Sequence, residues 1–165
     1  MRWLSNEASN IDPVSHAVRL LNDGKIVAVK GIGGFLLLAD ATSKKTVKKL
    51  RERKNRPSKP FACLFSDVDQ LRKIAHVSEK EAATLQGDDA PIVLLKLKRL
   101  KRDLAFSEIA PGLSRIGAML PNAPLLELIS SKFQLPLIAT SANSSGSPIV
   151  YKDVNAVSLL DGIAD

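Results

Sequence analysis

The segment Arg51–Pro60, with the sequence RERKNRPSKP, constrains this protein more than any other stretch of the chain. Ser43 can cap a helix that runs to about Lys54, and a loop stiffened by Pro57 follows the helix. The junction therefore holds the Lys54 ammonium and the Arg56 guanidinium close together, and this pair of groups suits an anionic ligand. A helix C-terminus also favours cations, so compensation of the helix dipole is the alternative explanation for some of these charges.

A second polar segment, Thr140–Gly146 with the sequence TSANSSG, follows an apolar run that is expected to form a buried strand. It offers hydroxyl groups, an amide and several backbone N–H groups within seven residues. Such groups can orient phosphate oxygens and a small planar acyl group. A plain polar turn is the competing explanation when this segment is taken alone.

A third segment, Lys30–Gly34 with the sequence KGIGG, joins two expected strands. Its three glycines allow the backbone to approach a ligand closely, because no Cβ atom intervenes. The segment is not a P-loop, because no Gly-Lys-Ser/Thr follows, and Leu36 stands where the dinucleotide-binding fingerprint needs its third glycine. A tight hairpin turn is the alternative interpretation.

Helical and strand patterns alternate along the chain between and around these three segments. We expect helices over 13–23, 43–54, 66–74 (capped by Ser66), 78–86 (with a capping box), 124–131 and 153–160 (capped by Asp153). We expect strands over 25–30, 35–40, 60–65, 91–97 (a buried strand), 115–119 and 137–140, with 99–108 as a loop or edge. This alternation predicts an α/β fold, with one domain over 12–165 preceded by an extension over 1–11.

The composition fits an ordinary globular domain. At 165 residues and 45% hydrophobic content, the chain can bury one real core. Its longest apolar runs are far shorter than the roughly 20 residues of a membrane span, and the first residues lack the apolar region of a signal peptide. The single cysteine, Cys63, cannot form an internal disulfide and is expected in the core. We therefore expect a cytoplasmic protein without membrane association.

Positive charge is concentrated in two parts of the chain. The net charge is +7, and 14 of the 24 Lys and Arg residues lie in two clusters, Lys44–Lys59 and Lys96–Arg102. Such clusters attract the phosphates of a nucleotide or of RNA, whereas a solvated helix face with surplus lysines is the alternative. His16 and His76 are interpreted as surface or boundary residues. No cluster of His, Asp and Glu indicates a protein-held metal.

The combination of segments is more specific than its parts. The pattern Lys54-x-Arg56-Pro57, followed about 85 residues later by Thr-Ser-Ala-Asn-x-Ser-Gly, resembles the YrdC-like (YrdC/YwlC) family. Within this family the chain is most similar to the YrdC-like domain of the hydrogenase-maturation carbamoyltransferase HypF. That likeness spans about Asp12 to Asp165 and is carried by KGIGGF (30–35), Asp40-Ala41, LRERKNRPSKPFA (50–62), PIVLL (91–95), APGL (110–113), IGAMLP (116–121) and GIAD (162–165).

The resemblance implies a twisted, mostly mixed β-sheet covered by helices, with a concave basic nucleotide site. It implies that ATP and a carbamoyl donor react to give carbamoyl-adenylate and pyrophosphate, with Mg²⁺ bound mainly through the nucleotide's phosphates and water. The implied catalytic residues are Lys54, Arg56, Ser141 and Asn143. The implied nucleotide-binding residues are Arg115, Thr140 and Lys59, and the implied substrate loop contains Lys30, Gly33 and Gly34.

Two other functions stay open within this family. One is synthesis of threonylcarbamoyl-adenylate for tRNA modification, and the other is binding of double-stranded RNA without catalysis. The sequence has one Trp and one Tyr, so RNA binding would depend on shape and charge more than on base stacking.

The chain departs from the HypF pattern at two places. Leu36 replaces a histidine, and 122–125 reads NAPL where the branch has Tyr-Thr-Pro-Leu; both changes affect the expected acyl pocket. The family pattern also continues beyond Asp165. The resemblance therefore implies a fragment or a reduced relative, inactive alone or acting with other HypF-type domains.

Overall fold

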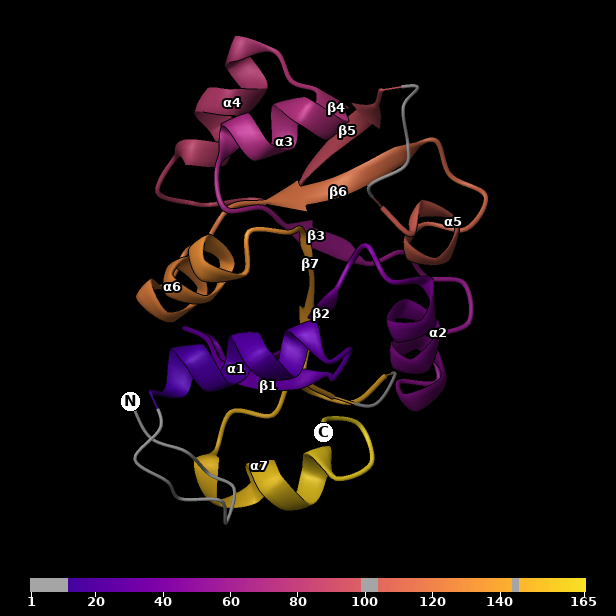
Figure 1. Ribbon diagram of the computed structural model, residues 1–165, viewed down its shortest axis with the longest axis vertical. Helices are drawn as coiled ribbons and strands as arrows, with labels where there is room; N and C mark the ends of the chain where they lie inside the picture. The colour runs from indigo at the N-terminus through magenta and orange to yellow at the C-terminus, as the bar shows by residue number, and fades with distance from the viewer. Residues whose placement is uncertain (1–11, 99–103, 144–145) are drawn as a thin grey trace.

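The computed structural model describes residues 12–98, 104–143 and 146–165, so the predicted extension over 1–11 lies outside the described residues (Figure 1). The helices are α1 Pro13–Asn22, α2 Lys44–Arg53, α3 Val68–Ile74, α4 Glu79–Gln86, α5 Phe106–Ile109, α6 Pro124–Phe133 and α7 Asp153–Leu160. The strands are β1 Val27–Lys30, β2 Phe35–Asp40, β3 Ala62–Leu64, β4 Ala75–His76, β5 Val93–Leu97, β6 Arg115–Met119 and β7 Leu137–Ser141. The predicted α/β class is confirmed.

The described strands form one mixed sheet in the order β1-β2-β7-β3-β6-β5-β4. Only the β3–β6 pair is parallel among them, and every other neighbouring pair is antiparallel. This confirms the mixed sheet that the resemblance implied. Because β7 lies between β2 and β3, the polar residues at its end come to lie between the glycine turn before β2 and the cationic segment before β3.

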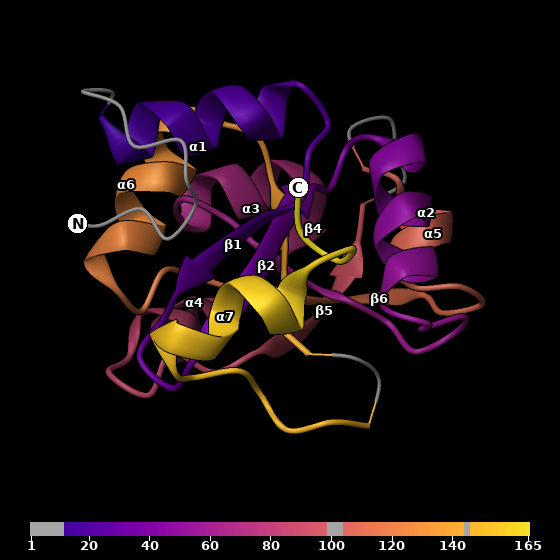
Figure 2. The same ribbon diagram turned by 90° about the horizontal axis from the view of Figure 1, so that it is seen from below.

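The two faces of the sheet are covered unequally. One face packs against α2, α3, α4, α5 and α7 in a core that includes Leu37, Cys63 and Ile116. The other face packs against α1 and α6, which contact one another and cover only part of it, around Leu38 and Leu64 (Figures 1 and 2). The uncovered part of this second face is where the site described below lies.

Local capping explains most helix starts. The side chains of Asp12, Ser43 and Ser78 accept hydrogen bonds from the first turns of α1, α2 and α4, and the predicted capping box of Ser78 is present. The prediction for Ser66 was wrong, because the carboxylate of Asp67 caps α3 by accepting from the backbone N–H of Gln70.

The prediction that Asp153 caps α7 was also wrong. Asp153 is the first helical residue, and its carboxylate forms an ion pair with Lys30 at the end of β1. This contact ties two segments that are more than a hundred residues apart in the sequence.

Two strands at the β4 end of the sheet differ from the sequence-based expectation. The strand expected over 91–97 begins at Val93 and is buried on one face only, because the helices leave Ile92 and Leu94 exposed on the other. His76, expected between helices, lies in the short strand β4. Residues 99–103 lie outside the described part of the chain, and the end of the expected loop forms α5.

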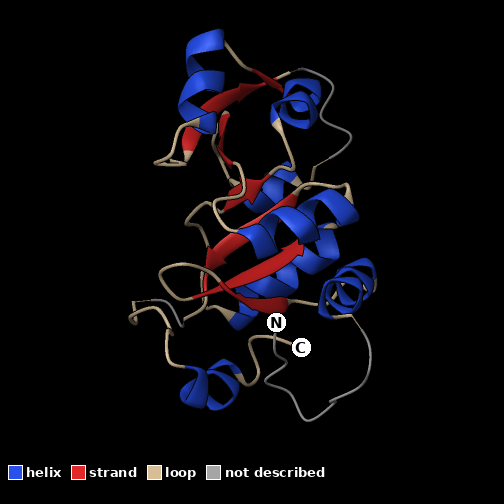
Figure 3. Cartoon of the chain, turned by 90° about the vertical axis from the view of Figure 1, so that its left-hand side faces the viewer, coloured by secondary structure: helices blue, strands red, loops and turns tan. Residues whose placement is uncertain are grey.

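Helix α7 lies at the opposite end of the molecule from β4 and β5 (Figures 1 and 3). In the described part of the chain, no helix combines the length and the apolar character that crossing a membrane requires.

Candidate functional site

Lys54, at the C-cap of α2, joins the two segments that the sequence singled out. Its side chain is buried, and its ammonium nitrogen donates to the carbonyl oxygens of Ser141 and Asn143, both at 2.7 Å, and to Asn143 Oδ1 at 3.1 Å. These contacts use all three ammonium N–H groups. Burial, and then repulsion from Arg56, lowers the pKa of Lys54 to about 8. Lys54 therefore holds the polar loop in place from behind instead of projecting into open space.

Arg51 organises the segment after α2, a role that sequence reasoning did not predict. Its guanidinium donates to the backbone carbonyl oxygens of Glu108, Arg56, Lys59 and Ile109 and lies 4.6 Å from the centroid of the Phe61 ring. A sequence signal existed: position 51 is one helical turn after the buried Val47, so it faces inward. The buried fork of Arg51 fixes the turn that carries Arg56.

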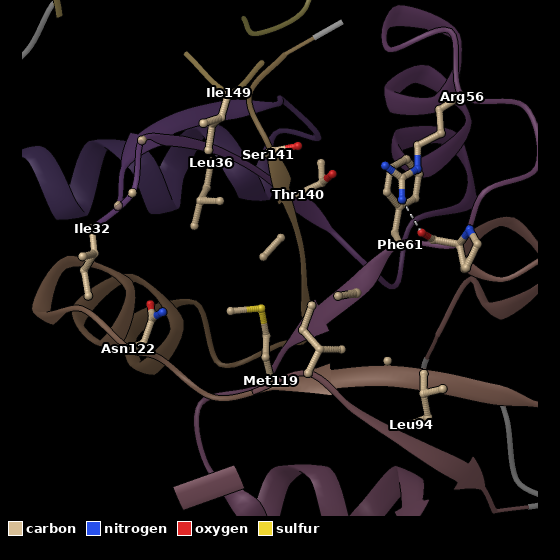
Figure 4. Close-up of a pocket in the computed structure, with 18 of the residues that line it drawn as sticks. Ile32, Leu36, Arg56, Phe61, Leu94, Met119, Asn122, Thr140, Ser141 and Ile149 are labelled. Atoms are coloured by element: carbon tan, nitrogen blue, oxygen red, sulfur yellow. Dashed lines mark hydrogen bonds between the residues drawn. The ribbon is translucent and has the colours of Figure 1, made fainter. Parts of the chain in front are cut away.

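Arg56 lines a cavity at its edge, with its guanidinium beside the ring of Phe61 (Figure 4). Its Nε donates to the Lys59 carbonyl oxygen and one terminal nitrogen donates to the Pro60 carbonyl oxygen at 2.6 Å. The guanidinium also lies 4.9 Å from the Phe61 ring centroid, so its position is defined on two sides. The side chain of Lys59 is exposed and does not line the cavity, although its carbonyl oxygen shapes the loop.

The cavity has a volume of about 520 Å³ and opens on the uncovered part of the sheet face. Its floor includes Ala139, Ala62 and Gly117, which face one another in register across β7, β3 and β6. A Cβ atom at Gly117 would lie only 3.0 Å from the side chain of Ile92, so a larger residue there would crowd the cavity. The three small residues leave space above the sheet for a ligand. The volume falls in the usual range of small-molecule sites.

Polar groups enter this apolar hollow from separate elements. Thr140 and Ser141 line it at the end of β7, and Asn122 lines it before α6 (Figure 4). The arginine of β6, Arg115, also lines it. Asn143 is not a lining residue; its side-chain oxygen accepts from the hydroxyl of Ser141 at 2.9 Å and from Lys54. Asn143 therefore orients Ser141 from behind.

The glycine turn forms another wall of the cavity. Gly34 has a φ of +148°, and a Cβ atom there would lie 2.8 Å from the Val150 carbonyl oxygen, so glycine is required. Gly33 and Gly34 line the cavity, whereas the ammonium group of Lys30 turns away to the carbonyl oxygen of Tyr151 and the carboxylate of Asp153. The turn is thus built into the site, and Lys30 anchors it to the segment before α7.

The predicted site residues therefore divide into two groups. The residues that line the cavity are Arg56, Arg115, Thr140, Ser141, Gly33 and Gly34. The residues outside its lining are Lys54, Asn143, Lys30 and Lys59. Leu36 and Asn122, where the sequence departs from the HypF pattern, both line the cavity. Their placement supports the expectation that these departures affect the ligand pocket.

The electrostatic character of the cavity favours an anion. Among the described lining residues there are two arginines and no carboxylate. The described residues also contain no group of three or more His, Cys, Asp and Glu side chains that could hold a metal ion. The arrangement suits a ligand that combines an apolar, flat part with phosphate groups.

Comparison with known proteins agrees with this geometry. The family model for Sua5, YciO and YrdC proteins, described as telomere recombination, matches residues 19–165. The chain is 41% identical over 161 residues to the carbamoyltransferase HypF of Synechocystis sp., a match that covers 98% of this chain and 20% of that relative. It is 31% identical over 166 residues to the threonylcarbamoyl-AMP synthase of Bacillus subtilis, covering 98% of this chain and 48% of the synthase.

A solved structure shows the same similarity in space. The crystal structure of full-length HypF in its phosphate- and nucleotide-bound form superposes with a TM-score of 0.91 at 40% identity, over 98% of this chain and 21% of that chain. The chain thus spans about a fifth of the length of the HypF relatives. Because the family model covers nearly all of the described residues, the protein belongs to the Sua5–YciO–YrdC family.

Proposed function

We propose that the cavity binds ATP and forms an acyl-adenylate, and that the acyl group is carbamoyl. The observation that carries this proposal is the contact of the Lys54 ammonium with Ser141 and Asn143. This contact fixes the hydroxyl-rich loop beside the arginine-bearing loop, at the wall of a cavity lined by two arginines and no described carboxylate.

The proposed reaction is compatible with where these charges lie. A carboxylate oxygen of carbamate attacks the α-phosphorus of ATP, the bond from that phosphorus to the bridging oxygen breaks, and pyrophosphate leaves with the bonding electrons. Negative charge builds on phosphate oxygens during this step, so the protein contributes alignment and positive charge more than a strong base. In this proposal, Arg56 and the hydroxyl of Ser141, which line the cavity, contact the reacting groups. Lys54 and Asn143 position the loop that carries Ser141.

Mg²⁺ fits this site only as part of the nucleotide. The described residues provide no cluster of metal ligands, and the cavity lining offers hydroxyl, amide and carbonyl oxygens but no described carboxylate. The ion, when bound, would neutralise phosphate charge and would be held mainly by phosphate oxygens and water.

The choice of carbamoyl over threonylcarbamoyl rests on relatedness. The chain is 41% identical to a carbamoyltransferase and 31% identical to a threonylcarbamoyl-AMP synthase. The two products differ in the carboxylate and side chain of threonine. Incubation of the chain with ATP and labelled ammonium carbamate, with and without threonine, separates the two by whether the labelled adenylate carries threonine.

Binding of double-stranded RNA is the weaker candidate. The basic run Lys44–Lys59 suggested a phosphate-tracking surface, but Arg51 and Lys54 donate into the protein. The positive charge available to an extended backbone is therefore smaller than the sequence suggests. Binding to RNA should be weak and should fall steeply with salt.

Calorimetric titration of ATP with Mg²⁺ into the chain tests the proposal. Arg56→Ala should weaken ATP binding by roughly tenfold or more, because a charged hydrogen-bond donor is lost from the cavity wall. Lys48→Ala, which removes an exposed cation of α2 outside the cavity, is the matched control and should leave the affinity unchanged. A folded chain that binds no ATP, or an Arg56→Ala variant with undiminished affinity, would contradict the proposed function.

A further inference from the structure

Three basic residues face one another in direct register across the far end of the sheet. His76 of β4 pairs with Lys96 of β5, and Lys96 pairs with Arg115 of β6. Directly opposed residues on one face of an antiparallel pair have their Cβ atoms about 5 Å apart. The three side chains therefore form a continuous basic row, on the sheet face opposite Ala75, Leu95 and Ile116 of the core.

This basic row lies in a second cavity of about 470 Å³, at the end of the molecule where β4, β5 and β6 meet (Figure 1). Arg72, Lys98, Ser78 and Glu81 complete most of its polar lining. Arg115 lines both this cavity and the candidate nucleotide cavity, so the two hollows adjoin at this residue.

The other charged groups of the second cavity are already engaged. Arg72 pairs with Glu79 at 2.7 Å, and the Lys98 ammonium donates to the Arg72 carbonyl oxygen. Glu81 accepts from the hydroxyl and the backbone N–H of Ser78 in the capping box. These two hydrogen bonds, and then the charge of Arg115, lower the pKa of the Glu81 carboxyl group.

The basic row itself has no such close partner; the Glu81 carboxylate interacts with the charge of Arg115 but forms no ion pair with it among the described contacts. Among the described residues, no carboxylate lies within ion-pair distance of His76, Lys96 or Arg115, and the Arg115 guanidinium makes one long contact, 3.4 Å, to the Leu94 carbonyl oxygen. Like charges placed directly opposite one another destabilise a sheet. An anion bound across the row would remove this repulsion.

We infer that the row formed by His76, Lys96 and Arg115 is a binding site for a phosphate-class oxyanion, separate from the floor of the nucleotide cavity. The donors of the row are exposed, so they can be reached from solvent. The anion can be free inorganic phosphate or pyrophosphate, or it can be the outer phosphates of a nucleotide that extends past Arg115. The site itself does not depend on the proposed function, but the second of these sources does.

Calorimetric titration of the chain with sodium pyrophosphate, ATP and AMP tests the inference. Lys96→Gln removes the charge, keeps a polar end group and shortens the side chain by one bond; it should weaken pyrophosphate binding by about five- to tenfold. Lys80→Gln is the matched control, because Lys80 is an exposed cation of α4 outside both cavities. His76→Gln is a second variant at the other end of the row and should weaken pyrophosphate binding in the same direction.

The three ligands separate the two sources. Loss of ATP affinity in Lys96→Gln with unchanged AMP affinity identifies the outer phosphates of the nucleotide as the anion, whereas unchanged ATP and AMP affinities identify free oxyanion. Pyrophosphate affinity that stays within twofold in both variants overturns the inference. If ATP and AMP do not bind but pyrophosphate binding still requires Lys96, the proposed function fails and this site stands.

Discussion

Two sets of cations in this protein belong to sequence segments rich in Lys and Arg or to a strand beside one, but one set is buried and the other is exposed. We call Arg51 and Lys54 the inward set, and Lys96 and Arg115 the outward set. In and after α2, Arg51 and Lys54 are buried and donate to backbone carbonyl oxygens of two distant segments, 108–109 and 141–143. In β5 and β6, Lys96 and Arg115 are exposed and face one another. The first set holds loops together, and the second set leaves its charge available to a ligand.

This difference shows which basic residues of the chain can bind an anion and which are used within the protein. A buried cation is stable only when its donors are satisfied, and Lys54 and Arg51 meet that requirement with carbonyl groups of the protein. An exposed cation is satisfied by water, which an anion can displace. Charge density along the sequence identifies neither case. The position of carbonyl oxygens from distant segments decides between them.

The largest expected effect tests the inward set. Lys54→Met should lower the free energy of unfolding by about 3 kcal/mol, because it leaves the carbonyl groups of Ser141 and Asn143 without their donor in a buried position. Urea denaturation followed by circular dichroism measures this change. Lys48→Met, at an exposed position of the same helix, should change stability by less than about 0.5 kcal/mol. Equal losses in the two variants would break the comparison.

Local patterns gave much of the fold, because the rules that set them act over a few residues. The caps at Ser43 and Ser78 and the strands on either side of the glycine turn needed only neighbouring residues. The partial exposure of β5 could not be predicted in this way. Leu94 is apolar, but it is 62% exposed because α1 and α6 stop short of it.

The sequence predicted which loops come together at the candidate site, but not which of their residues line the cavity and which support it from behind. The sequence indicated that the segment around Arg56 and the loop at Ser141 meet, and the structure places both beside one cavity. It could not indicate that the ammonium group of Lys54 would be fully used by carbonyl oxygens. Backbone acceptors belong to every residue alike, so their positions leave no signal in residue types.

An intermediate loss of stability is expected when the carboxylate that pairs with two cations of α2 is removed. Asp165 accepts from Lys49 at 2.7 Å, from Arg53 at 3.2 Å and from the backbone N–H of Ile26. Burial alone would raise the pKa of Asp165, but these hydrogen bonds lower it from 3.8 to about 2. Asp165→Asn should therefore reduce stability near neutral pH by about 1 kcal/mol, a value discounted for solvent screening.

The pH dependence of that effect has a definite sign. Between pH 3.8 and about 2, the unfolded chain binds more protons at Asp165 than the folded chain does, so this contribution falls as the pH falls. The difference in unfolding free energy between the native chain and Asp165→Asn should be full above about pH 5, should fall through both pKa values, and should vanish only near pH 1. Asp161→Asn, at an exposed position, is the control. A difference that persists unchanged at low pH would rule out the carboxylate as its source.

The smallest expected effect tests the outward set. The informative quantity is the sign of the change in unfolding free energy. Lys96→Gln should leave the free energy of unfolding unchanged or raise it by about 0.3–0.5 kcal/mol, because it removes the repulsion between Lys96 and Arg115 in register. The gain should shrink as sodium chloride is raised to about 0.5 M, since salt screens exposed charges. Thermal unfolding in the two salts, without added phosphate, measures it. A loss above about 1 kcal/mol would mean that Lys96 stabilises the fold as Lys54 does, and the distinction between the two sets of cations would fail.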